Sequence, residues 1–106
     1  MFKKYVHIGV PHTNEMEGEV WNEDMKLWMI DPSTNEFGYE YLRFRDDTWF
    51  AKEVQENVHI ACEVESIDEV LPTCEKVLHD KIVVDEHLTI AFVMKDGVCL
   101  ELMECK

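Results

Sequence analysis

The chain has 106 residues, enough for one domain with a hydrophobic core of its own. Apolar residues make up 46% and charged residues 31%, and the net charge is −13. This acidity argues against nucleic acid or an anionic membrane surface as a partner, because both require a basic patch. No segment is long and apolar enough to span a membrane or resembles a signal peptide, so we expect a cytoplasmic protein.

The first half of the sequence predicts three strands. Residues 3–10, KKYVHIGV, are rich in β-branched residues, and Pro11 ends this strand. Residues 11–25 show neither alternation nor a helical stripe, so we expect a loop with at most one helical turn, able to act as a lid. The other elements expected in this half are strands at 26–30 and 39–44 and a short helix within 45–57.

The second half opens with a predicted strand at 57–64, NVHIACEV. Ser66 and Glu69 then form a capping-box pattern, which predicts a helix. We expect this helix to end near Pro72, because a proline inside it would remove a hydrogen bond and clash with the preceding turn. The other elements expected here are a strand at 75–79 and a hairpin of strands at 87–94 and 98–105 around the turn KDG.

The two halves share a plan. YVHIGV at 5–10 is echoed by NVHIAC at 57–62, which indicates an internal repeat. Each half later has a strand that carries a glutamate, Glu40 in YEYLRF and Glu101 in LELMEC. We therefore predict a single α+β domain over 1–106, with a first module at about 1–46, a connector at about 47–56 and a second module at about 57–106. The first module is shorter, so its helix is reduced or missing.

Strand parity predicts where the repeated side chains point. His7 and His59 lie on the faces opposite the aliphatic residues of their strands, which we expect to face the core. If a pseudo-twofold axis relates the halves, the two histidines converge with Glu40 and Glu101. Two imidazoles and two carboxylates suit a divalent ion such as Zn, Ni, Co, Mn or Fe(II), and leave two positions for water or substrate. Glu63, on the face of His59, is a further candidate for acid–base catalysis, although a solvated carboxylate is the simpler interpretation.

Cysteine chemistry is not indicated. The four cysteines form no C-x-x-C pair, so a zinc knuckle is not predicted and reduced thiols are expected. Six aromatic residues are more typical of core or dimer-interface packing than of a pocket wall: Tyr5, Trp21, Trp28, Tyr39, Tyr41 and Trp49.

The paired plan, with histidine on the first strand and glutamate on the last strand of each half, resembles the vicinal oxygen chelate superfamily of glyoxalase, bleomycin-resistance and dioxygenase-like proteins. The resemblance covers nearly the whole chain and is clearest in VHIACEVESIDEVL and TIAFVMKDGVCLELME. It implies two βαβββ-type modules that form a cup-shaped, mostly antiparallel sheet. It also implies a metal held by His7, Glu40, His59 and Glu101. The chain is short for such a protein, and KDGVC replaces the usual D-P-x-G-N before the last strand.

The resemblance implies a metal-dependent lyase or isomerase-type enzyme that acts on a small substrate with adjacent oxygens through a metal-stabilised enolate. Glu101 or Glu40 then transfers the proton. Arg43 and Arg45 are the only arginines, which disfavours glutathione or coenzyme A as substrates because their anionic groups need cationic partners. Two alternatives stay open: a non-catalytic, bleomycin-resistance-like protein that binds a small molecule, and an α+β interaction domain that forms a homodimer.

Overall fold

The computed structural model describes residues 1–106 and contains one sheet of eight strands in the order β2-β3-β4-β1-β5-β8-β7-β6. The strands are β1 (Phe2–Pro11), β2 (Val20–Asn22), β3 (Leu27–Met29), β4 (Tyr39–Phe44), β5 (His59–Val64), β6 (Lys76–Val83), β7 (Leu88–Lys95) and β8 (Val98–Cys105). β1 pairs in parallel with β4, and β5 pairs in parallel with β8, whereas the other five pairings are antiparallel. The sheet is therefore mixed.

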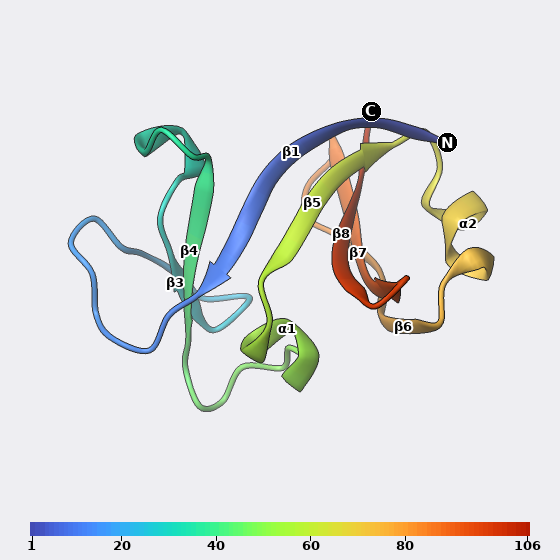
Figure 1. Ribbon diagram of the computed structural model, residues 1–106. Helices are drawn as coiled ribbons and strands as arrows, with labels where there is room; N and C mark the ends of the chain where they lie inside the picture. The colour runs from blue at the N-terminus through green and yellow to red at the C-terminus, as the bar shows by residue number, and fades with distance from the viewer.

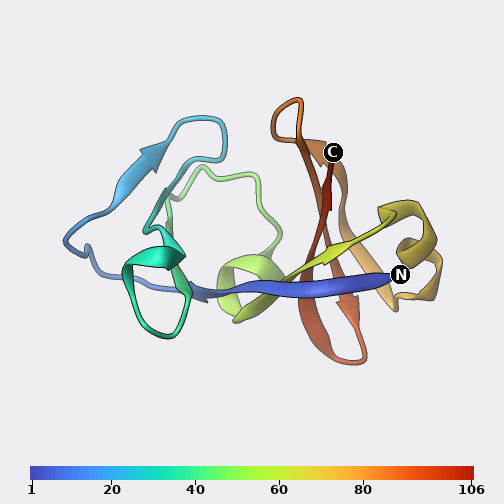
Figure 2. The ribbon, with the colours of Figure 1, turned by 90° about the horizontal axis from the view of Figure 1, so that it is seen from above.

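The sheet curls into a half-barrel. β1 and β5 run side by side through its middle (Figure 1), and the end formed by β2 and β3 faces the end formed by β6 and β7. Figure 2 shows these two arms on opposite sides of the molecule, with the short helix α1 (Lys52–Glu56) between them. Curling of this kind follows from the right-handed twist of strands. Helices that could cross a membrane are not found.

The second helix, α2 (Ile67–Val70), covers the outer face of the second half. Ile67 packs there against Val64 of β5 and Leu102 of β8 in a buried apolar cluster. As predicted, the helix ends near Pro72, which lies in the single 3₁₀ turn η2 (Leu71–Thr73).

The predicted capping box at the start of α2 is wrong. The side chain of Ser66 makes no capping hydrogen bond. The backbone N–H of Ile67 instead donates to the Glu104 carboxylate of β8 at 2.8 Å. A residue distant in sequence thus satisfies one of the free N–H groups at the helix start.

The first half departs from two further expectations. Residues 11–25 were expected to form a loop, but they include the short strand β2. The only helical element of this half is the 3₁₀ turn η1 (Pro32–Thr34). The aliphatic face of β1 is not uniformly buried, since Val6 is 43% exposed, and Val58, just before β5, is 54% exposed. The reason is that α2 covers the outer face of the second half alone. Cys62 and Val64 of β5 are therefore buried beneath it, whereas in β1 the more buried side is the concave, histidine-bearing one.

Candidate metal centre

Four neighbouring strands carry the four residues that the sequence predicted to converge. His7 lies on β1, Glu40 on β4, His59 on β5 and Glu101 on β8, and these strands are adjacent in the middle of the sheet. One ligand atom from each residue lies within 4.8 Å of each of the others. The structure therefore contains a His/Glu cluster that can hold a metal ion.

Strand register explains why the four side chains meet. Residues paired across neighbouring strands point to the same face, and two such rows cross the concave side of the sheet. One row is His7, Ala61 and Glu101 on β1, β5 and β8, and the other is Glu40, Gly9 and His59 on β4, β1 and β5.

Each row has a small residue, Ala61 or Gly9, between its two ligands. These small residues leave the space above the sheet in which the longer side chains turn toward one another. Sequence parity alone did not single them out, although the repeat contains the signal, since VHIG and VHIA each place a small residue two positions after the histidine.

Gly9 is the tighter of the two positions. A Cβ atom built at residue 9 would lie 2.0 Å from Cε1 and 2.3 Å from Nε2 of His59, so the imidazole occupies the space that any larger residue would need. Only glycine leaves room for the His59 ring beside the backbone of β1. Gly9 is therefore a positioning residue for this ligand.

The distances within the cluster match those between ligands of one ion. Nε2 of His59 lies 3.1 Å from Oε1 of Glu101, and Nε2 of His7 lies 3.3 Å from Glu40 Oε1 and 3.4 Å from Glu101 Oε1. Ligand atoms at about 2.1 Å from a metal are about 3.0 Å apart at neighbouring octahedral positions and about 4.2 Å apart at opposite ones. The cluster needs only small side-chain movements to surround one ion.

The charges within the cluster are strongly coupled. Burial disfavours the charged form of His7, but the carboxylates of Glu101 and Glu40 outweigh it and raise the pKa of His7 to about 10. Burial likewise disfavours ionised Glu101, but the imidazoles of His59 and His7 outweigh it and lower the pKa of Glu101 to about 2. Without a metal, a protonated His7 therefore offsets part of the carboxylate charge at neutral pH.

Two buried ring nitrogens test how well the cluster fits a metal. Nε2 of His7 is buried and has no well-aligned hydrogen bond, although two carboxylates lie nearby. A buried polar atom without a partner is costly, and a cation between these groups would satisfy it. Nδ1 of His59 also has no partner, which departs from the second hydrogen bond that metal-bound histidines usually make. The donor set of two imidazoles and two carboxylates nonetheless fits a borderline divalent ion.

The cluster opens into a cavity of about 270 Å³ inside the half-barrel. Its walls are mainly aliphatic side chains, methionines and phenylalanines, including Phe44, Phe50 and Phe92. None of the six tyrosines and tryptophans considered in the sequence lines this cavity. Trp21 and Trp28 instead pack on each other and under the guanidinium groups of Arg45 and Arg43.

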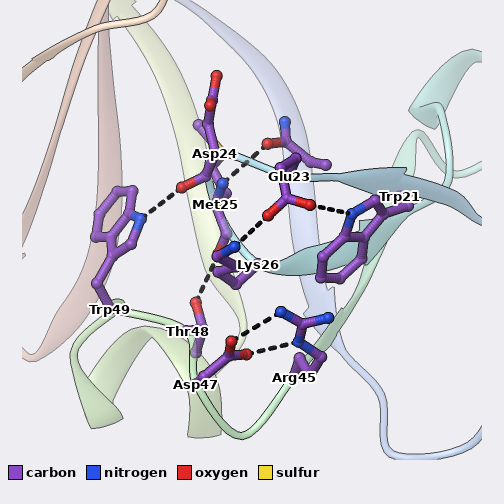
Figure 3. A network of polar contacts seen from close by, with 10 residues as sticks. Trp21, Glu23, Asp24, Met25, Lys26, Arg45, Asp47, Thr48 and Trp49 are labelled. Carbon is purple, nitrogen blue, oxygen red and sulfur yellow. Dashed lines mark hydrogen bonds and ion pairs between the residues drawn. The ribbon is translucent and has the colours of Figure 1, made fainter.

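One wall of the cavity is held by the polar network in Figure 3. Asn22, at the end of β2, and Met25, in the turn that follows, belong to the lining. The Thr48 hydroxyl donates to the carbonyl of Met25 and the Trp49 indole N–H donates to the carbonyl of Asp24, each at 2.7 Å. The network therefore fixes this turn to the segment that leads into α1.

Other charged candidates lie outside the cluster. The Glu63 carboxylate forms an ion pair with Lys3 at 3.0 Å and is not part of the cavity lining. Arg43 makes a two-pronged ion pair with Glu19, and Arg45 makes one with Asp47. Both guanidinium groups are thus engaged and do not reach the cavity.

A scan against protein-family models finds no match to this sequence, and a search of curated proteins finds none either. The likeness to the vicinal oxygen chelate superfamily therefore depends on the sequence pattern, the curled sheet and the His/Glu cluster.

Proposed function

We propose that this protein is a metal-dependent enzyme of the lyase or isomerase type, related to the vicinal oxygen chelate superfamily, whose substrate is a small molecule with adjacent oxygens. The observation that carries the proposal is the convergence of His7, Glu40, His59 and Glu101 at the wall of an apolar cavity. Within this proposal, residues 1–46 and 57–106 are two βαβββ-type modules, the first without its helix. The equivalent parallel pairings of β1 with β4 and of β5 with β8 support that division.

The roles of the four residues follow from their surroundings. His7 and His59 supply the nitrogen donors, and Glu101, which lies between the two imidazoles, supplies the central carboxylate. A bound divalent ion would supply the Lewis acid that favours loss of a proton from carbon beside a carbonyl group. Glu40 contacts only His7 within the cluster, so it is the carboxylate with the greater freedom to accept and return that proton.

The cavity walls support the same chemistry. Leu27, Leu42 and Phe92 are almost fully buried around the site, so the charged groups face mainly apolar side chains. Electrostatic interactions are stronger in such an environment than in bulk water. A substrate held there would be shielded from competing reactions with solvent.

The first test is the metal content of protein purified without a nickel-affinity step or a chelator. We expect about one divalent ion per chain by elemental analysis. His7→Ala and His59→Ala should each lose the ion while retaining the circular dichroism of the wild type. His87→Ala is the matched control, because the His87 side chain is 74% exposed and remote from the cluster. Protein that contains no metal and binds none at micromolar concentration would refute the proposal.

The apolar cavity also favours one alternative, a non-catalytic protein that binds a small molecule in the manner of bleomycin-resistance proteins. In that case the ligand should bind equally well to the metal-loaded and to the metal-free wild type. Ligand binding that requires the metal favours the enzyme.

A further inference from the structure

The cavity next to the cluster has an unusually uniform lining. Seventeen residues line it, and apart from the four potential ligands only Asn22 is polar. The walls are formed by side chains such as Leu27, Met29, Phe44 and Met103. No lysine or arginine contributes, although the chain has ten of them. A ligand in this space meets apolar surface everywhere except at the cluster and at one amide.

We infer that the cavity accepts ligands of one chemical class. Such a ligand is about the size of a single ring, its body is apolar and uncharged, and its two oxygens lie at one end. This inference rests on the proposed function, since the oxygens are taken to bind the metal. It adds that the rest of the ligand is apolar and uncharged, and it excludes substrates with a remote carboxylate or phosphate.

The exclusion of a remote anion follows from the lining. An anionic group buried against aliphatic and aromatic side chains loses its hydration and gains no compensating partner. Arg43 and Arg45 are the only arginines of the chain, and both are paired with carboxylates outside the cavity. When the divalent ion is bound, the carboxylates of Glu40 and Glu101 balance its charge, so the cluster offers no excess positive charge to a remote anion.

The size limit follows from the volume. A cavity of about 270 Å³ lies just below the ~300–1,000 Å³ of pockets that hold drug-sized ligands. A six-membered ring with its substituents fits this space, whereas a long thioester or tripeptide conjugate would extend out of it.

Asn22 gives the ligand one possible hydrogen bond away from the metal. Its Oδ1 accepts from the backbone N–H of Met25 at 2.9 Å, while its Nδ2 donates to no protein group. The turn that holds it is fixed by Thr48 and Trp49 (Figure 3), so the amide is oriented before a ligand arrives. A neutral acceptor on the ligand suits this donor.

The test uses two probes with the same adjacent oxygens, catechol and 3,4-dihydroxybenzoate, which differ by one remote carboxylate. The full chain is loaded with Zn²⁺, which has no redox chemistry, and each probe is titrated by calorimetry at pH 7.5. We expect catechol to bind about tenfold tighter or more. Binding of both probes should be lost in the metal-free protein.

A variant with a cation in the wall provides a second measurement. Met25 is half-buried at the cavity, and its side chain takes no part in the hydrogen bond to Asn22. Met25→Lys should shift the preference toward 3,4-dihydroxybenzoate by about tenfold, whereas the uncharged control Met25→Gln should leave the preference for catechol in place.

The outcomes separate this inference from the proposed function. Failure to take up Zn²⁺ refutes the proposed function. Uptake of Zn²⁺ with equal or tighter binding of 3,4-dihydroxybenzoate by the wild type overturns the inference and leaves the metal site standing. Uptake of Zn²⁺ with binding of neither probe overturns the inference as well.

Discussion

Gly9→Ala is the smallest change that should disable the cluster without touching a ligand. The new Cβ atom would lie 2.0 Å from Cε1 of His59, and ordinary van der Waals contact begins at 3.4 Å, so the two atoms must separate by about 1.4 Å (3.4 − 2.0). His59 is 1% exposed and packs edge-on against Phe92, so the ring has little free space into which to move. The clash therefore displaces a ligand, a strand, or both.

The magnitude follows from the precision that metal sites require. Ligand distances in metal sites vary by only about 0.2 Å, so a displacement of more than 1 Å should remove His59 from coordination. We expect Gly9→Ala to weaken metal affinity about 100-fold or more. Overpacking of this kind also costs about 1–3 kcal/mol in the free energy of unfolding. Backbone strain does not contribute, because Gly9 lies in a strand without a positive φ.

The assays are metal affinity by competition with a chromophoric chelator and the free energy of unfolding by urea denaturation. The double variant Gly9→Ala/His59→Ala serves as the control, because removal of the imidazole relieves the clash. His59→Ala should therefore be less destabilising in the Gly9→Ala background than in the wild type, with a coupling energy of about 1 kcal/mol or more. Unchanged metal affinity and stability in Gly9→Ala would show that the His59 ring does not lie over Gly9.

Three further predictions concern protonation and helix capping. Metal binding at pH 7.5 should release about one proton per ion, because His7 has a pKa of about 10 in the metal-free protein and must lose its proton to bind the ion. Calorimetry in buffers of different ionisation enthalpy measures the number of protons released, and metal binding without proton release would contradict the prediction. His79 accepts the Ala51 N–H at 2.9 Å, and burial lowers the pKa of this imidazole despite the opposing effect of Glu53. Its folded-state pKa is below the unfolded value, so its stabilising effect is present above about pH 6.5 and is lost as the pH falls. His79→Gln should thus lose less stability than the wild type between pH 7.5 and 5.5 in urea denaturation, and an equal loss would refute this role. Glu104→Ala should cost about 1 kcal/mol of unfolding free energy by removing the cap of α2, and a stability equal to that of the wild type would contradict the capping role.

The positions of the main strands were predictable because their signals are local. Alternation and turn formers placed β4 and β8 at their observed bounds and β7 within one residue. Pro72 likewise marked the end of α2. The cap of α2 was not predictable from local pattern, because Glu104 lies 37 residues from Ile67 in sequence. The three-residue strand β2 is too short to show alternation.

The candidate site was partly predictable because a repeat carries more information than a single residue. One histidine on a strand has many explanations, but His7 and His59 in matching contexts, each followed by a strand with a glutamate, indicated convergence. The residues that form the cavity walls could not be predicted from the repeat. Phe50 lies just before α1 and Phe92 lies on β7, and only the curl of the sheet brings both to the cavity.

The four donors are divided evenly along the chain, since residues 7 and 40 precede the connector and residues 59 and 101 follow it. Each half supplies only one imidazole and one carboxylate of the cluster. An ion therefore gains all four ligands only after β1 and β5 have paired. If the proposed ion binds, it would link the two halves across the pairing of β1 with β5. It would raise the free energy of unfolding by about 2.7 kcal/mol when its free concentration is 100 times the dissociation constant. Metal supply in the cell would then govern how long the protein escapes proteolysis, independently of any catalysis.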